Sequence, residues 1–222
     1  MAIYLDTTAW SRRDAFGFFR GFDKPFFNVC VRLDVARLKH VLDAAGRPAG
    51  LSLACYYLAL RLANEQQPFR LRFEGERVRV HEVIGGSSTV LREDEESFGF
   101  ANFDYAADFA RFAAEAGAAI RAARRDPTDF EPRPDDVARI HFTTLPWLHF
   151  TSFSHARVWR RDGQAEDSVP KLAFGRADAE GERLWMPMSV EVHHALMDGV
   201  HVGRFVQAFE AALQDPAAAL GL

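Results

Sequence analysis

Little in this chain of 222 residues points to an oxidising compartment, a polyanionic partner or a membrane. Cys30 and Cys55 are the only cysteines, and both lie in apolar stretches, so we expect buried free thiols in a reducing compartment. The net charge is −4 and arginines are dispersed among acidic residues, which argues against nucleic-acid binding. No apolar segment is long enough to span a bilayer, and the first residues do not form a signal peptide. We therefore expect a cytoplasmic protein without membrane contact.

The short motifs of several large enzyme classes are also missing. The sequence has no glycine-rich phosphate loop, no GxSxG nucleophile turn and no HExxH helix. No second cluster of Cys, His or Asp residues supports a metal site, so we expect none.

Phenylalanine, in contrast, is abundant, with 20 residues in a chain that is 48% hydrophobic. A chain of this size can bury one substantial core, which predicts a single domain over residues 1–222. The excess of phenylalanine fits a deep core, an apolar ligand tunnel or a subunit interface, and composition does not choose among them.

Hydrophobic periodicity predicts alternating helices and strands. Thr8 is expected to cap the first helix, and Asp34 the second. Glu74–Glu76 reads as a hairpin turn, residues 177–182 as a second turn, and residues 126–136 as a proline-broken loop. The predicted helices are 9–20, 34–45, 51–64, 106–125 and 200–213. The predicted strands are 2–8, 26–33, 69–73, 77–81, 87–92, 97–103, 139–144, 150–153, 171–177 and 183–192. Together they predict an α+β layered domain with a mixed or antiparallel sheet.

The segment HHALMDG, from His193 to Gly199, carries the clearest chemical information. It follows a predicted strand, so an imidazole there can be held rigidly and aimed at a cleft. His194 can act as a general base, because a neutral imidazole accepts a proton near physiological pH. Asp198 can orient that imidazole or can hold the turn by pairing with an arginine. Two alternatives stay open: turn residues satisfied by backbone contacts, and metal ligation by His194, Asp198 and His201.

The same segment resembles the HHxxxDG motif of CoA-dependent acyltransferases, and in detail it is similar to the chloramphenicol acetyltransferase family. HHxxxDG alone is shared with condensation domains and plant acyltransferases. Further blocks occur in the family's order along nearly the whole chain: Trp10–Phe16, Pro68–Arg70, Thr89–Val90, Glu96–Phe98, Leu145–Phe153 and Leu184–Val192. Together they are much more specific than the motif alone.

The resemblance implies a catalytic role for two residues and a supporting role for two more. His194 would deprotonate an acceptor hydroxyl, which attacks the thioester carbonyl of acetyl-CoA. Ser152 would donate a hydrogen bond to the oxyanion that forms. Asp198 would form a buried salt bridge with Arg12 and so hold the catalytic turn. Acetyl-CoA would be a co-substrate, with no permanently bound cofactor.

The resemblance also implies a fold and an assembly. Family members are two-layer α/β sandwiches with a mixed, largely antiparallel sheet. They assemble as homotrimers whose active sites lie between subunits. Related acyltransferases in longer chains carry two such halves around one channel. A chain with a single half therefore needs a neighbouring subunit to complete its site.

The sequence departs from the family mainly where the acceptor binds. Phe18, Phe19 and Phe27 are expected to contact the acceptor, and Phe19 stands where drug-resistance enzymes carry a tyrosine. Ala173 replaces a threonine that helps to bind a water. Tyr56 and Arg176 are the candidate CoA contacts.

These departures leave acyl transfer intact but put the acceptor identity in question. O-acetylation of chloramphenicol is the leading hypothesis. The alternatives are an acyltransferase for another small hydroxylated compound and a non-catalytic binding protein of the same fold. A dihydrolipoamide-type acyltransferase core is disfavoured by the lack of a lipoyl domain and a flexible linker.

Overall fold

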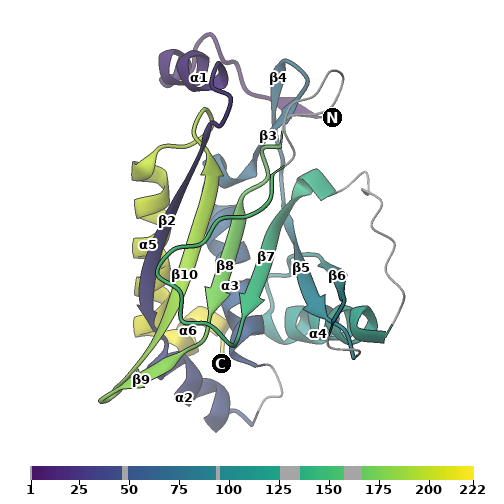
Figure 1. The fold of residues 1–222 in the computed structure, drawn as a ribbon, viewed down its shortest axis with the longest axis vertical. Coiled ribbons are helices and arrows are strands. Elements are labelled where there is room, and N and C mark those ends of the chain that lie inside the picture. Colours follow the sequence, from purple (N-terminus) through teal and green to yellow (C-terminus); the bar gives the residue numbers. More distant parts are fainter. Residues whose placement is uncertain (1, 47–49, 94–95, 126–135, 158–166) are drawn as a thin grey trace.

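A mixed sheet of seven strands forms the centre of the computed structural model, with helices packed on one face (Figure 1). The structure describes residues 2–46, 50–93, 96–125, 136–157 and 167–222. Six of the strands lie side by side in the order β2 (Phe26–Asp34), β10 (Arg183–His193), β8 (Lys171–Gly175), β7 (Arg139–Leu145), β5 (Gly85–Leu91) and β6 (Phe98–Phe103). The short strand β9 (Asp178–Glu180) pairs with the start of β10.

Strands β5, β7 and β8 run parallel to one another, and the remaining pairs are antiparallel. The sheet is therefore mixed and largely antiparallel, as predicted. β10 is the strand that leads to the histidine pair, and it lies between β2 and β8.

The helices bury the apolar face of the sheet. Helix α3 (Leu51–Glu65) is apolar on almost all sides and lies in the core together with α5 (Gly199–Gln214). Helix α4 (Phe109–Arg125) covers β5 and β6, while α2 (Ala36–Ala44) and α6 (Pro216–Leu220) pack near the C-terminus. Alternate residues of β10, from Met186 to Val192, enter this core, whereas Ser189 and Glu191 between them point to the other face.

A smaller unit lies beyond the tip of β10. It consists of α1 (Arg13–Arg20) and a three-stranded sheet of β1 (Ile3–Tyr4), β4 (Arg77–Val80) and β3 (Leu71–Glu74). The turn between β3 and β4 contains Gly75 at φ +59°, a conformation that glycine adopts without strain. The 3₁₀ turns Gln67–Arg70 and Asp136–Ala138 precede β3 and β7. Trp10, Phe16 and Phe19 pack with Phe73 and Val78 in a second apolar cluster beneath α1.

The structure corrects three boundaries that the sequence suggested and adds one helix. The first helix begins at Arg13 rather than residue 9, because Asp6 accepts hydrogen bonds from the amides of Thr8 and Ala9 and holds a turn there. Residues 67–70 form a 3₁₀ turn before β3, and the predicted turn at 177–182 contains β9. Helix α6 was missed. Most of the predicted loop 126–136 lies outside the described residues.

The predicted strand 150–153 is also wrong. Residues 146–157 form no strand but cross the face of the sheet that α3 and α5 leave open (Figure 1). No helix of the described residues is long and apolar enough to cross a membrane.

Candidate active site

The two histidines at the end of β10 have different surroundings. His193 is 1% exposed, and its ring lies edge-on to Phe26 and Phe73. Its Nδ1 accepts a hydrogen bond from the amide of Ala195 at 3.2 Å. His193 is therefore part of the core, and its hydrogen bond with the amide of Ala195 holds the beginning of the turn that follows β10.

His194 reaches the surface, with 30% of its side chain exposed. Its ring stacks on Phe19 at a centroid distance of 3.6 Å and an interplanar angle of 9°. The ring of Phe27 also contacts it, at a centroid distance of 4.6 Å. The amide of His194 donates to the carbonyl of Pro25 at 2.7 Å, which ties the turn to the start of β2. The imidazole is thus fixed in both its backbone and its ring plane.

The two nitrogens of His194 are not equivalent. Nδ1 is buried and lies 3.2 Å from Oδ1 of Asp198, without the geometry of a hydrogen bond. Nε2 is the nitrogen that remains available to a ligand. An imidazole held in this way can accept a proton at Nε2 from a bound hydroxyl.

Arg12 and Asp198 form a two-point ion pair beneath this turn. Arg12 donates from Nε to Oδ2 at 2.8 Å and from Nη2 to Oδ1 at 2.6 Å. It also donates to the carbonyls of Ala195 and His194, at 3.0 and 3.1 Å, and its guanidinium lies 5.0 Å from the ring of Trp10. Hydrogen bonds from Arg12 lower the pKa of Asp198. One arginine just before α1 thus holds three positions of the turn that carries His194.

Asp198 also begins helix α5. Its amide donates to Nδ1 of His201 at 2.9 Å, so that nitrogen of His201 is an acceptor and the imidazole is neutral. Burial, followed by the charge of Arg12, lowers the pKa of His201 and favours this neutral form. The carboxylate of Asp198 is already paired with Arg12, and Nδ1 of His201 already accepts from the amide of Asp198. These residues therefore stabilise a turn and do not converge as metal ligands would. Within the described part of the chain, no three Cys, His, Asp or Glu side chains gather as a metal site would require.

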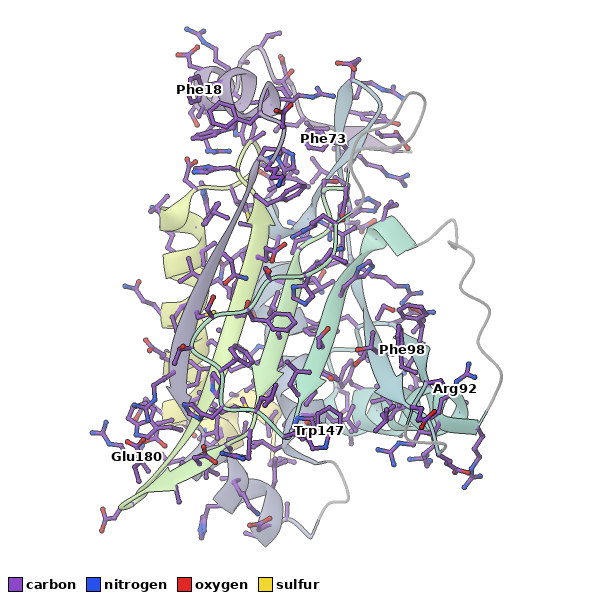
Figure 2. The ribbon with its side chains drawn as sticks, viewed as in Figure 1. Phe18, Phe73, Arg92, Phe98, Trp147 and Glu180 are labelled. Carbon is purple, nitrogen blue, oxygen red and sulfur yellow. The ribbon has the colours of Figure 1, made fainter. Side chains whose placement is uncertain are left out.

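Ser152 lies on a different part of the molecule, in the segment that crosses the open face of the sheet. Its side chain is exposed, and its hydroxyl has no hydrogen-bond partner among the described residues. Phe150, before it, lies beside Gly175, which is also close to Pro187 on β10, and the amide of His155, after it, donates to Glu191. Figure 2 shows Trp147 where this segment begins, at the opposite end of the sheet from Phe18 on α1.

Ser152 and His194 of one chain are therefore well separated. Strand residues rise roughly 3.3 Å each, so His194 lies about 10 Å beyond Glu191 and about 23 Å beyond Pro187 along β10. Ser152 lies in the chain between Phe150, which is beside Gly175, and His155, which bonds to Glu191, so it belongs to that part of the sheet. A reacting atom has to lie within about 3 Å of both groups, so one chain does not bring them together.

The candidate acceptor contacts gather around His194. Phe19 and Phe27 touch its ring, and Phe18 packs against Phe19 at 5.1 Å while 63% of its own surface remains exposed. Phe22 completes this aromatic group at 4.9 Å from Phe18 and 5.4 Å from Phe19. The exposed rings offer an apolar surface beside the imidazole.

The candidate CoA contacts do not lie beside His194. Tyr56 is only 3% exposed, and its hydroxyl is shared between Ser88 at 3.0 Å and Thr144 at 2.6 Å. Burial raises its pKa. A direct contact between this side chain and a ligand is therefore not available in the described structure, and its contacts give it a core role.

Arg176 is exposed just after β8, near Trp147, and pairs with Asp178 at 2.7 Å. Ala173, where the resemblance leads one to expect a threonine, is buried opposite Ser189 on the face that the Ser152 segment crosses. Its methyl group offers no polar contact there.

Sequence reasoning missed several residues that hold the site. The carbonyl of Pro25 and the indole of Trp10 support the turn that carries His194. Of the two, only Trp10 belongs to a segment that resembles the family, Trp10–Phe16. Glu191 and Arg157 form a buried ion pair on the open face, 2.6 Å apart. No local pattern could have linked them, because they are far apart in the chain.

The matching family model and the sequence relatives point to one family. The chloramphenicol acetyltransferase family model matches residues 2–210. The chain is 26% identical over 206 residues to chloramphenicol acetyltransferase 3 of Escherichia coli, covering 93% of this chain and 94% of that protein. It is 29% identical over 216 residues to the chloramphenicol acetyltransferase of Streptomyces acrimycini, covering 96% and 94%. A solved chloramphenicol acetyltransferase structure superposes with a TM-score of 0.82 at 29% identity, covering 96% of this chain and 100% of that one.

Proposed function

The chain belongs to the chloramphenicol acetyltransferase family and is a CoA-dependent O-acetyltransferase, and we propose that it acetylates a hydroxyl group of chloramphenicol. The reaction takes place in a ternary complex with acetyl-CoA as the co-substrate. His194 is the general base and Ser152 stabilises the oxyanion.

The geometry of His194 is the main support for this function. Its ring is clamped against Phe19, its backbone is tied to Pro25 and Arg12, and only Nε2 is left for a ligand. In the proposed reaction, Nε2 accepts the proton of the acceptor hydroxyl as the oxygen attacks the thioester carbonyl. The same imidazolium then returns the proton to the CoA thiolate as the tetrahedral intermediate collapses.

The hydroxyl of Ser152 suits the second role because it has no partner among the described residues. Such a hydroxyl is free to donate to an oxyanion. Loss of one such donor typically costs about 2.7–4 kcal/mol of transition-state stabilisation.

The separation of Ser152 from His194 within one chain supports assembly as a homotrimer. In this arrangement each site takes His194 from one subunit and Ser152 from the next. A cyclic assembly repeats that contact at every interface, so all copies are equivalent.

Release of free CoA tests the activity directly. Purified protein is mixed with acetyl-CoA and chloramphenicol, and the thiol released is followed with a thiol reagent. We expect turnover with the native protein and none with His194→Ala, while His40→Ala, which changes an exposed histidine on α2, is the matched control and stays active.

Three results would change the proposal. Release with other alcohols but not with chloramphenicol would keep the enzyme class and change the acceptor. Absence of release with every acceptor would favour a binding protein. An active His194→Ala variant would overturn the mechanism.

Mixed trimers test the shared site. His194→Ala and Ser152→Ala chains are unfolded together in equal amounts and refolded. Random assembly gives both native groups to about a quarter of the sites, so activity should recover to about that fraction of the native value. If both groups acted within one chain, the mixture would only average the two parent activities.

A further inference from the structure

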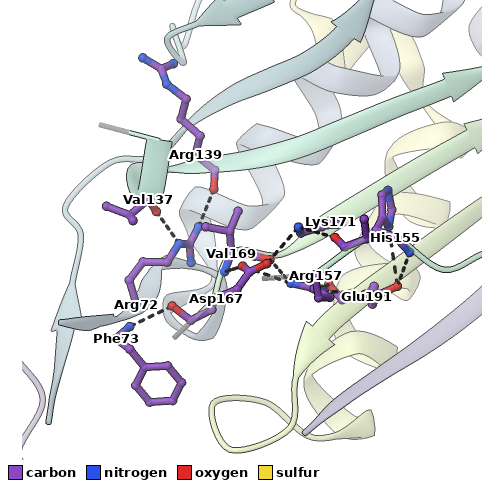
Figure 3. Close-up of polar contacts among 12 residues, drawn as sticks. Arg72, Phe73, Val137, Arg139, His155, Arg157, Asp167, Val169, Lys171 and Glu191 are labelled. Atoms are coloured by element: carbon purple, nitrogen blue, oxygen red, sulfur yellow. Dashed lines mark hydrogen bonds and ion pairs between the residues drawn. The ribbon is translucent and has the colours of Figure 1, made fainter. Parts of the chain in front are cut away.

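A group of buried charged side chains lies beneath the segment that carries Ser152, and the reaction described above does not use it. Glu191, Arg157, Asp167 and Lys171 each have side chains no more than 10% exposed. Glu191 comes from β10, Arg157 from the segment itself and Lys171 from the start of β8, while Asp167 lies just before β8 (Figure 3). Burying four charges is costly unless each is paired, so their arrangement requires an explanation.

Glu191 is the side chain that joins this segment to the strand that ends in the histidines. Its Oε1 accepts from Nε of Arg157 at 2.6 Å, and its Oε2 accepts from the amide of His155 at 3.0 Å. The amide group of Asn28, on β2, lies 3.5 Å from Oε2. The carboxylate thus binds the segment through one side chain and one backbone amide.

Further contacts of the charged groups hold residues His155–Arg157 of the segment in place. Arg157 donates to the carbonyl of Val169 at 2.8 Å, and its guanidinium lies over Phe26 at 4.4 Å. Lys171 donates to the carbonyl of Ala156 at 3.0 Å and pairs with Asp167 at 3.0 Å. The segment has no strand hydrogen bonds at this point, so these side chains replace them.

The carboxylate remains charged throughout the working range of an enzyme. Burial would raise the pKa of Glu191, but hydrogen bonds from His155 and Arg157 outweigh that effect and lower the pKa to about 2. The pair is therefore a permanent ionic contact.

The segment is anchored a second time on the other side of Ser152. The carbonyl of Leu148 accepts from the amide of Arg176 at 2.7 Å, and Phe150 packs closely on Gly175. Ser152 lies between the two anchors with no partner of its own among the described residues. Its distance from the sheet is therefore set by the anchors on either side.

We propose that Glu191 is a positioning residue for catalysis: by holding the backbone at His155–Arg157, it fixes the Ser152 hydroxyl where the oxyanion forms. This inference rests on the proposed function of Ser152. It assigns Glu191 an effect on the transition state rather than on binding, because Ser152 donates its strongest hydrogen bond only when the oxyanion exists. A displacement of about 1 Å can lower a rate about 10²-fold.

A double-mutant cycle tests the inference. Glu191→Gln removes the charge, and Glu191→Asp keeps the charge but withdraws it by one methylene group. Each is made in the native protein and in Ser152→Ala, and kcat and KM for acetyl-CoA are measured. We expect kcat to fall about 10–100-fold in the native background with little change in KM, and less than about 2-fold in Ser152→Ala.

Controls separate positioning from general destabilisation. Glu180→Gln breaks an exposed ion pair with Arg32 and should leave kcat unchanged. If Glu191→Gln does not fold, the Glu191→Asp arm, which preserves the buried charge, carries the test. Melting temperatures accompany every variant.

Two outcomes would overturn the inference. An equal fall in kcat in both backgrounds would show that Glu191 acts independently of Ser152. A Ser152→Ala protein as active as the native one would remove the group through which Glu191 is proposed to act. An inactive His194→Ala in the same assay would still support the general base, so failure of the inference is distinguishable from failure of the proposed function.

Discussion

Replacing Asp198 with asparagine should lower both the stability and the activity of the protein. Asparagine keeps the shape of the side chain and can accept one hydrogen bond, but it removes the charge that Arg12 binds at two points. The guanidinium, whose side chain is only 11% exposed, then keeps the carbonyls of Ala195 and His194 but loses its counter-charge. The turn that carries His194 is loosened as a result.

The burial of the two partners sets the size of the effect. Breaking a fully buried pair costs about 3–5 kcal/mol, whereas exposed pairs contribute about 0–1 kcal/mol. The side chain of Asp198 is 34% exposed, so solvent screens it and we expect about 2 kcal/mol. For a chain of this length that corresponds to a fall in melting temperature of about 4–8 °C.

The dependence on pH gives a second readout. The pKa of Asp198 is lowered from its ordinary value of 3.8, so its contribution to stability is complete above that value and disappears as the pH falls through the lower, folded-state pKa. The difference in melting temperature between native protein and Asp198→Asn should therefore be constant from about pH 5 to 8 and should close below about pH 4.

The assay is a thermal melt at fixed protein concentration, paired with CoA release. Asp43→Asn, which removes an exposed partner of Lys39, is the matched control and should melt like the native protein. We expect kcat of Asp198→Asn to fall at least about 10-fold, because His194 is displaced. An unchanged melting temperature at pH 7, or a difference that widens on acidification, would show that the charge of Asp198 does not stabilise the turn.

Two further substitutions test other parts of the structure. Tyr56→Phe removes a hydroxyl bonded to Ser88 and Thr144 and should cost about 1–3 kcal/mol of stability without raising KM for acetyl-CoA; a raised KM with an unchanged melting temperature would instead favour a direct CoA contact. Gly175→Ala would place a methyl group 2.6 Å from the carbonyl oxygen of Leu148 and 2.5 Å from Pro187, so it should lower the melting temperature. Gly203→Ala, with no atom within 4 Å, is its control, and equal melting of the two variants would contradict this account.

The elements that sequence reasoning predicted well are those whose pattern is local. Residues 51–65 are apolar on nearly every side, and they form the buried helix α3. The hairpin at Gly75 and the strand that leads to His193 also follow from local signals. The turn at His194 was identifiable because its motif is contiguous, and Arg12 entered only through the resemblance, since it lies far from Asp198 in the chain.

The features that were missed depend on contacts between distant residues. Residues 150–153 alternate like a strand, but their neighbours bond to the side chains of Glu191 and Lys171 instead of a ladder. Tyr56 lies on a helix whose pattern does not reveal which polar tips are satisfied internally. The order of the strands follows from long-range pairing, which periodicity does not encode.

The ion pairs Arg12–Asp198 and Arg157–Glu191 near the end of β10 differ in burial, and therefore in how far water and dissolved ions weaken them. Asp198 is a third exposed, so salt and strong acid both weaken its pair with Arg12. Glu191 and Arg157 are 5% and 6% exposed, so dissolved ions screen them far less, and the pKa of Glu191 at about 2 keeps the pair intact even in mild acid. The turn with the general base is therefore the part of the site that solution conditions can loosen, while the segment with Ser152 keeps its position. A loss of activity in saline buffer or below about pH 4 should accordingly trace to the turn of His194 and not to Ser152.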